Sequence, residues 1–451
     1  MNFSKSIYSS LIIIGIPLIG SNVAQYFLTI IDTAMLGHYN PVALASVVIA
    51  GIFFFSIFIV GSGFSFAIIP LVSAYNARGE TKQIRRITRM GLWMAFIYTM
   101  IMLGLFLNSE KVLVGIGQSL EVASFAQDYL RIMGFGIFPA LLFFTLRNYL
   151  TGLKHTQVTF WVTITVIPLK IVLNWVFIFG NLGMPELGIR GAAFSTLAVQ
   201  TMMVALLIIY VNLKLKDHNL FNRLWIIEFP HLKKIFTLGL PIGLTYLAET
   251  SLFTATAVMM GWLGTVELAA HGITMQLAGL SFMFHVGLSQ AATTVTGHAY
   301  GKHEGGQKLR KIGEATIGLS IAYALIIIAL FVFFPRVLLS LFLDKNLTLS
   351  EEILSLATTL LMIAAVFHLV DGLQATGLGL LRGIQDVRVP FMLALVSYWI
   401  FGIGSGYVLA FVFELGSIGL WFGLVIGLTI AAIGLIWRYW FRTSGILNYG
   451  T

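Results

Sequence analysis

Long apolar runs recur from one end of this 451-residue chain to the other. A helix needs about 20 consecutive, mainly apolar residues to cross a bilayer, and within lipid its backbone groups bond to one another. Only 10% of the residues are charged, against about 25% in an ordinary soluble domain. The runs predict an all-α integral membrane protein with twelve transmembrane helices, at residues 9–36, 44–75, 90–108, 122–152, 158–180, 190–213, 234–262, 267–299, 313–343, 350–380, 389–412 and 417–440.

The basic residues are distributed unevenly among the loops. Most of the 27 Lys and Arg residues lie at the N-terminus, in the C-terminal tail or in the even-numbered connections, as Arg78, Lys82 and Lys302 do. Inside the predicted helices we identify Arg131 and Lys170. Cytoplasmic loops of membrane proteins carry such an excess, so we expect both termini in the cytoplasm. The net charge of +9 then reflects topology, and nucleic acid is not an expected partner.

The two halves of the chain resemble each other. The segment from Gly15 aligns without a gap on the segment from Gly239, and ELGIRGAAF at 186–194 recurs as ELGSIGLWF at 414–422. Each half holds six predicted helices, so both enter the membrane from the same side. We therefore expect two six-helix lobes related by a pseudo-twofold axis along the membrane normal. Matched residues in the first window include Pro17 and Pro241, Ala24 and Ala248, and Met35 and Met259.

The repeat sets the expected domain boundaries. Residues 1–213 form the N-terminal lobe, 214–233 a cytoplasmic linker, and 234–451 the C-terminal lobe. The linker has basic ends around an apolar centre, a pattern typical of a segment that lies on a membrane surface.

A few charges fall within the predicted helices. They are Asp32, Glu249, Asp371 and Lys170. An ionisable side chain at the centre of a membrane helix costs about 2.5–3.5 kcal/mol on insertion scales and often marks an ion or substrate path. Lys170 would either neutralise Asp32 or contact substrate. Asp128 is different, because it can pair with Arg131 along one helix face.

The repeat argues that the carboxylates are functional additions. Gln25 stands where the second lobe has Glu249, and the counterpart of Asp371 is an alanine. The shared scaffold therefore requires neither acid. The competing structural interpretation is that each carboxylate is a buried hydrogen-bond acceptor that ties helices together.

Two carboxylates that face one cavity make a cation-exchange site. A proton, a sodium ion or an organic cation can each neutralise them, but not all at once. Such competition is sufficient for antiport, with inward ion flow driving export.

Other chemistry finds little support in the sequence. HEGGQ at 303–307 lacks the second histidine of a zinc protease motif, no phosphate-binding Gly-Lys-Ser/Thr loop exists, and cysteine is absent. We therefore expect neither an enzyme nor a cofactor. His368 lies three residues before Asp371, on nearly the same helix face, and is a candidate proton partner. His271 and His285 are expected to be polar groups in helix packing.

Several segments together resemble the multidrug and toxic compound extrusion (MATE) family, in its bacterial NorM-type branch. They are GLPIGLTYLAETSLF at 239–253, LAAHGI at 268–273, VDGLQATGLGLLRGIQD at 370–386 and LNWVFIFGNLGMPELGIRG at 173–191. The resemblance covers essentially the whole chain. It implies a two-lobed, twelve-helix exporter of small cationic, amphiphilic compounds that exchanges them for protons or sodium ions.

The resemblance also implies roles for particular residues. Glu249 and Asp371 match the family's coupling-cation site, and would be the metal ligands if the ion is sodium. Asp32 and Asn174 match first-lobe residues implicated in proton coupling or substrate handling. Sodium-linked relatives carry a tyrosine where this chain has Phe367, and the lost hydroxyl favours protons.

We expect a monomer in the bacterial inner membrane. The alternative within transport is a lipid-linked oligosaccharide flippase of the same superfamily. A flippase would need arginines and lysines along its cavity to bind pyrophosphate, and the predicted helices supply few.

Overall fold

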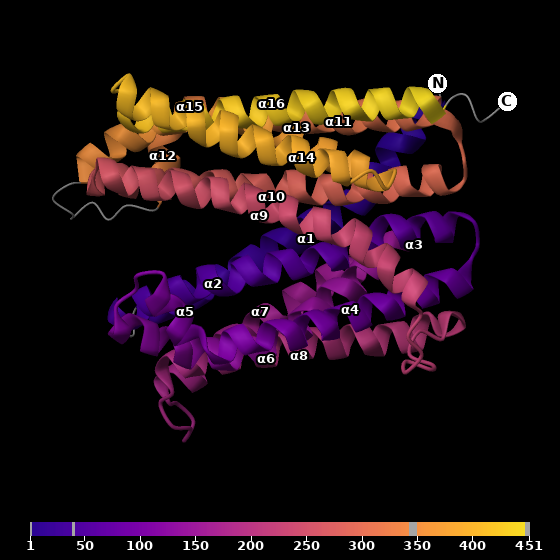
Figure 1. The fold of residues 1–451 in the computed structure, drawn as a ribbon, viewed down its shortest axis with the longest axis horizontal. Helices are drawn as coiled ribbons and strands as arrows, with labels where there is room; N and C mark the ends of the chain where they lie inside the picture. The colour runs from indigo at the N-terminus through magenta and orange to yellow at the C-terminus, as the bar shows by residue number, and fades with distance from the viewer. Residues whose placement is uncertain (1, 38–40, 342–349, 447–451) are drawn as a thin grey trace. The chain divides into compact units, whose positions relative to one another are not determined.

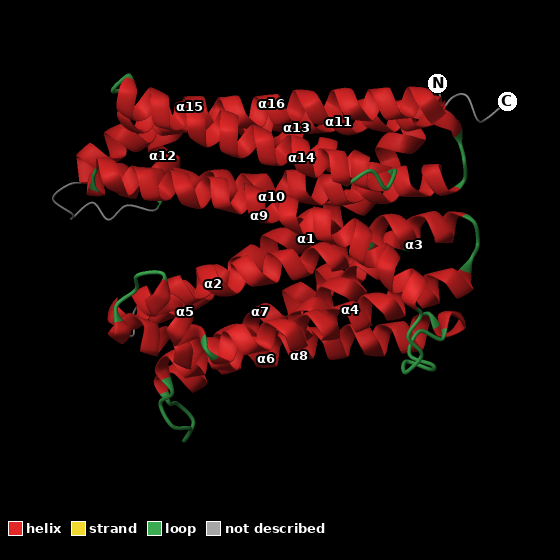
Figure 2. Cartoon of the chain, in the orientation of Figure 1, coloured by secondary structure: helices red, strands yellow, loops and turns green. Residues whose placement is uncertain are grey.

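The structure is a computed structural model that describes residues 2–37, 41–341 and 350–446. All regular secondary structure in these ranges is helical (Figures 1 and 2). The helices of the first half are α1 (Asn2–Gly37), α2 (Pro41–Phe66), α3 (Ile68–Ala77), α4 (Thr81–Leu107), α5 (Ser109–Gly115), α6 (Leu120–Gly152), α7 (Thr156–Phe179), α8 (Gly188–Lys214) and the 3₁₀ turn η1 (Lys216–His218).

The second half is built in the same way. Its helices are α9 (Phe229–Leu263), α10 (Thr265–Gly301), α11 (Gly305–Phe333), α12 (Pro335–Leu339), α13 (Ser350–Gly383), α14 (Arg388–Val396), the π-helical η2 (Ser397–Ile403), α15 (Gly404–Tyr407), the π-helical η3 (Val408–Val412) and α16 (Gly416–Ile446).

Eleven spans in the described part of the chain are long and apolar enough to cross a membrane. The twelfth predicted span, 267–299, corresponds to α10, which is 37 residues long but more polar than the others. It carries His271, Gln276, His285 and Gln290. The prediction of an all-α membrane protein is confirmed.

Three predicted helices are not single α-helices, and one of them, the run 313–343, is divided at Phe334 into α11 and α12. The run 44–75 is divided at Ala67 into α2 and α3, and the run 389–412 alternates between α- and π-helix. Gly63 lies just before the break at Ala67, and a methyl group on it would come within 2.5 Å of the Gly239 carbonyl oxygen. Close packing against the α9 backbone explains why a glycine is needed there.

The described chain forms two compact units. The N-terminal unit is Gly20–Gly243, and the C-terminal unit is Met1–Ile19 with Leu244–Thr451. The divisions after Ile19 and Gly243 are equivalent positions of the repeat, each two residues after a matched proline. The first part of α1 therefore packs within the C-terminal unit, and the first part of α9 within the N-terminal unit. The boundaries at 213/214 and 233/234 stay a prediction based on the repeat.

The repeat is visible in the contacts within each unit. Tyr98 of α4 donates its hydroxyl to the Ile57 carbonyl (2.6 Å). At the matched positions Tyr323 of α11 donates to the Ser281 carbonyl (3.0 Å). The two halves thus share a packing scheme as well as a sequence pattern.

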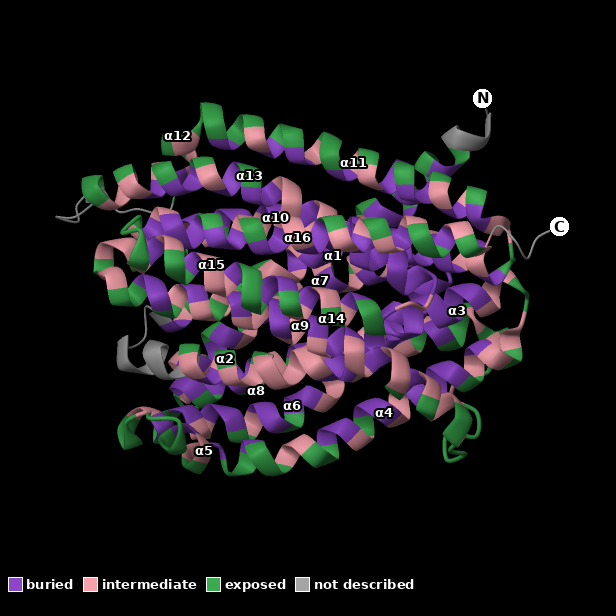
Figure 3. Ribbon diagram, turned by 45° about the horizontal axis from the view of Figure 1, so that its top comes forward, coloured by how far each residue is buried: buried purple, intermediate pink, exposed green. Residues whose placement is uncertain are grey.

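Large apolar side chains cover the outer faces of the helices. Trp161 is 62% exposed, Ile326 59% and Trp437 66%, while small and polar residues fill many of the buried positions. Figure 3 shows how buried and exposed positions alternate along the helices. A soluble protein rarely exposes so much apolar surface. Lipid is the solvent that this surface fits.

Candidate functional site

The acidic residue of α1 sits in a closed polar cluster of the N-terminal unit. Lys170 of α7 lies 2.8 Å from Asp32, Nζ to Oδ1, and donates to the Thr196 hydroxyl of α8 (2.5 Å). Asn174 Nδ2 donates to Asp32 Oδ1 (2.8 Å), and the Thr196 hydroxyl lies 3.3 Å from Asp32 Oδ2. Lys170 is 2% exposed and the Asp32 side chain 20%.

This geometry decides between the two roles considered for Lys170. Its ammonium group neutralises Asp32, and two further hydrogen-bonding groups, Asn174 and Thr196, hold the pair. Gln25, two turns earlier on α1, does not join the cluster: its buried Nε2 has no hydrogen-bond partner among the described residues.

The acids of the second half come together in the C-terminal unit. Glu249 of α9 is 8% exposed and Asp371 of α13 is 3% exposed. Their helices meet through Phe253 and Phe367, one turn from each acid, whose ring centres lie 6.0 Å apart, and through the hydrogen bond from Arg382 to Tyr246. One oxygen of each carboxylate, Glu249 Oε1 and Asp371 Oδ1, is buried without a hydrogen-bond partner in the described part of the chain.

Polar neighbours from three elements complete this second cluster. The Tyr398 hydroxyl of η2 accepts a hydrogen bond from Gln374 Nε2 of α13. Arg382 Nη1 of α13 donates to the Tyr246 hydroxyl of α9 (2.6 Å), and its guanidinium lies 4.5 Å from the centre of that ring. Arg382 is therefore bonded to a tyrosine, and no ion pair between it and either acid is found among the described residues.

Two of the buried basic residues were missed at the level of sequence. Arg147 of α6 is 1% exposed and donates to Asn22 Oδ1, and Arg382 is 7% exposed. Arg147 lies inside the predicted run 122–152, and Arg382 lies two residues beyond the predicted run 350–380. The available signal for Arg147 was its place within an apolar run, whereas the burial of Arg382 depends on where α13 ends.

The expected Asp128–Arg131 pair is wrong. Asp128 Oδ1 pairs instead with Arg190 Nη2 (3.0 Å), and Arg131 donates to the Leu107 carbonyl. Both Asp128 and Arg190 are well exposed, so the long arginine of another helix reaches the acid without a burial cost.

His368 and Phe367 lie one turn before Asp371 on α13. The His368 ring bonds to Ser281 and His285, and no hydrogen bond to Asp371 is found among the described residues. Phe367 is 2% exposed and packs edge-on against Phe253 and Trp421. Position 367 therefore belongs to an aromatic cluster and offers no oxygen ligand.

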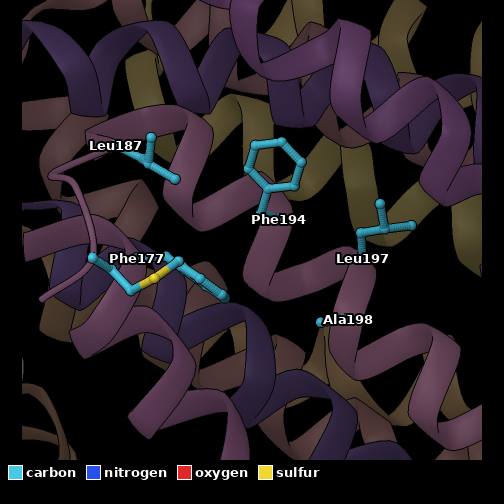
Figure 4. Close-up of a pocket in the computed structure, with 6 residues that line it drawn as sticks. Phe177, Leu187, Phe194, Leu197 and Ala198 are labelled. Carbon is cyan, nitrogen blue, oxygen red and sulfur yellow. The ribbon is translucent and has the colours of Figure 1, made fainter. Parts of the chain in front are cut away.

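The surface hollows lie apart from these clusters. One, of about 400 Å³, is lined by apolar residues where the segment after α7 meets α8 (Figure 4): Phe177, Met184, Leu187, Phe194, Leu197 and Ala198. It contains none of the predicted site residues. Its lining has no charge with which to hold an ion.

Known proteins match the chain over nearly its whole length. The MatE family model matches residues 17–176 and again 241–408, so each half carries one copy. The probable multidrug resistance protein NorM of Rhizobium meliloti is 40% identical over 97% of this chain and 93% of the relative. The protein of the same name from Agrobacterium fabrum is 40% identical over 96% and 93%.

Solved structures agree on the fold. The eukaryotic MATE transporter AtDTX14 superposes with a TM-score of 0.86 at 20% identity, covering 99% of both chains. A MATE structure in complex with MaL6 gives a TM-score of 0.87 at 20% identity, covering 98% and 97%. These matches confirm the predicted two-lobed, twelve-helix fold class. The chain is a multi-pass membrane protein of the MatE family, the MATE multidrug efflux transporters.

Proposed function

We propose that this transporter is an antiporter that exports cationic amphiphilic compounds in exchange for inward-moving protons or sodium ions. Glu249 and Asp371 bind the coupling ion. The supporting observation is that each carboxylate keeps one buried oxygen that has no hydrogen-bond partner in the described part of the chain.

The charges of the second cluster support one monovalent cation. Two ionised acids and one guanidinium leave a net charge of −1, which a single mobile cation would cancel. A carboxylate in a dry environment needs such a partner, because burying an uncompensated charge is expensive. A structural acid would instead be expected to have both oxygens bonded, as Asp32 has.

Exchange follows from competition for that charge. Ion entry from outside favours release of the organic cation, and binding of the organic cation favours release of the ion, because coupling between two binding events is reciprocal. Inward movement of one charge supplies about 2.3 kcal/mol per 100 mV of membrane potential. That energy drives export against a gradient.

Protons are the favoured coupling ion. Phe367 supplies no hydroxyl to a sodium shell, and sodium prefers several oxygen ligands, as other hard cations do. Asp32, Asn174 and Lys170 would handle substrate or shape the first lobe without exchanging an ion. We place the protein as a monomer in the bacterial inner membrane with both termini cytoplasmic, from the distribution of its basic residues.

The buried basic residues bear on the flippase alternative. Lys170, Arg147 and Arg382 would supply positive charge for a pyrophosphate group. Each, however, bonds to a protein oxygen, on Asp32, Asn22 and Tyr246 respectively. This argues for antiport of cations over transport of an anionic lipid.

The test is dye efflux from proteoliposomes with a proton gradient and a sodium gradient imposed separately. We expect Glu249→Gln and Asp371→Asn each to abolish ion-driven export while the protein still inserts. Asp128→Asn is the matched control, because it removes an exposed acid that pairs with Arg190. Normal ion-driven export by both cluster variants would refute the assignment.

A further inference from the structure

Two histidines of the C-terminal unit form a hydrogen-bonded pair in the protein interior. His285 of α10 and His368 of α13 are both 0% exposed, and their Nε2 atoms lie 3.2 Å apart. Ser320 Oγ of α11 lies 3.1 Å from His285 Nδ1, and Ser281 Oγ lies 3.4 Å from His368 Nδ1. All four ring nitrogens therefore have partners.

The hydrogen bonds determine which group donates and which accepts at each step between Ser320 and Ser281. Ser281 donates its proton to the Ala278 carbonyl (2.9 Å), so it accepts from His368 Nδ1–H. His368 Nε2 then accepts from His285 Nε2–H, and His285 Nδ1 accepts from the Ser320 hydroxyl. A neutral imidazole has one donor and one acceptor nitrogen, so this assignment satisfies both rings.

One additional proton fits the chain after a single hydroxyl rotation. Ser320 passes its hydroxyl proton to His285 Nδ1 and takes up the additional proton in its place, so that its oxygen then accepts the new N–H bond. The Nε2 proton of His285 can then pass to His368 Nε2, so that His368 becomes the imidazolium and His285 is neutral again. The positive charge is shared by two rings, and the proton has moved to the residue one turn before Asp371.

No ion pair to either histidine is found among the described residues. On α11 the titratable neighbour is Tyr323, with its ring 5.3 Å from that of His285. On α13 it is Asp371. The charged residues of α16 bond elsewhere, Arg438 and Arg442 to Asp386.

The shared scaffold does not require the pair. At the positions matched by the repeat, the N-terminal unit has Gly61 for His285 and Ile137 for His368, with Ala95 for Ser320 and Ile57 for Ser281. Large and small side chains also change places between the matched positions of the two units. Gly61 makes room for Tyr98 and Leu141, whereas His285 fills the space that Gly372, the counterpart of Leu141, leaves open.

Gly372 shows how closely the ring is fitted. A methyl group there would lie 2.3 Å from His285 Cε1 and 2.5 Å from Nε2. The backbone beside Asp371 thus lies directly against the imidazole.

We propose that His285 and His368, with Ser320 as the entry group, form a proton-binding site that takes up one shared proton beside the Glu249–Asp371 cluster. It rests on the proposed antiport for its role, which is to hold a coupling proton near Asp371. Imidazole nitrogens bind a proton but are poor ligands for sodium, so the site is specific to protons.

The test counts protons taken up by the purified full-length protein after a rapid drop in pH, with an indicator dye. We expect His285→Asn and His368→Asn each to take up one proton fewer than the parent protein. The double variant should also lose one, because the two rings share a single proton. No loss in the single variants, or a loss of two in the double variant, would overturn the proposal.

Two further variants guard against misfolding and against a purely structural effect. Ser320→Ala keeps both rings and should slow proton uptake by about 10²-fold, since a positioned proton-transfer group contributes a factor of that order. Thr316→Val, one turn earlier on α11, removes a hydroxyl that bonds only within its own helix and should leave the rate unchanged. Equal rates in Ser320→Ala and the parent protein would exclude Ser320 as the entry group.

A third control is His271→Asn. This residue is also buried, but its ring packs against Trp421, so the proton count should not change. Dye efflux by the parent protein separates the two proposals. If the parent protein shows no proton-driven efflux but the histidine variants lose one proton as predicted, the antiport is refuted and the histidine site stands. If the parent protein shows normal efflux but the single variants take up as many protons as the parent, the histidine site is refuted and the antiport stands.

Discussion

The acids of the two halves occupy similar scaffolds but are neutralised in opposite ways. Asp32 has a permanent cation, Lys170, at 2.8 Å, and its remaining bonds come from Asn174 and Thr196. Glu249 and Asp371 each keep one buried oxygen without a hydrogen-bond partner among the described residues. In the first cluster the protein itself neutralises the acid, and in the second cluster the acids need a further positive charge. A mobile cation can bind to and leave a site whose acids the protein itself does not fully neutralise.

The largest difference should appear in stability. Asp32→Asn leaves the buried ammonium of Lys170 without its counter-charge, and breaking a buried pair in this way costs about 3–5 kcal/mol. Lys170→Met should cost less, because Asp32 is partly exposed and keeps its bonds to Asn174 and Thr196. Thermal unfolding in detergent measures both, and the double variant should recover most of the loss.

The second cluster should respond with the opposite sign. Glu249→Gln and Asp371→Asn each remove an uncompensated buried charge, so stability should be unchanged or higher. A loss of several kcal/mol in either variant would show that these acids have structural partners, and the contrast between the two halves would fail.

An intermediate effect is expected where the two halves exchange large and small residues. Gly372→Ala places a methyl group 2.3 Å from the His285 ring, and overpacking of this kind costs about 1–3 kcal/mol. Adding His285→Ala should relieve the clash. If the unfolding temperature of the Gly372→Ala variant equals that of the parent protein, the close fit described for this ring is wrong.

The smallest effect tests what the halves have in common. Tyr98→Phe and Tyr323→Phe each remove one hydroxyl that donates to a matched carbonyl. A single hydrogen bond contributes about 0.5–1.5 kcal/mol, so we expect equal, small losses in unfolding measurements. Clearly unequal losses would mean that the repeat does not preserve this contact.

Much of the fold was predictable because membrane helices can be recognised in a sequence by their length and hydropathy. The repeat could be detected from the order of residues alone. The acids could be identified because charged residues are rare in apolar runs. The break at Ala67 was not predicted, because residues 66–69, Phe-Ala-Ile-Ile, are apolar and contain no helix-breaking residue.

The site was predictable only in part. Sequence analysis selected Asp32, Glu249 and Asp371 but left the role of Lys170 open, because pairing across helices depends on their relative rotation. It assigned Arg382 to a loop, although one helical turn decides whether an arginine at a helix end is buried. It treated His285 as a packing group, since the three-dimensional contact with His368 spans helices far apart in the sequence.

The central claim is that exchange of the cation requires the second cluster and does not require the Asp32–Lys170 pair. The most direct measurement is the release of bound protons, or of bound radioactive sodium, when a cationic dye binds to the purified protein. We predict that release persists in the Asp32→Asn/Lys170→Met double variant and disappears in Glu249→Gln and Asp371→Asn. Release that persists in both second-cluster variants but is lost in the double variant would contradict the account.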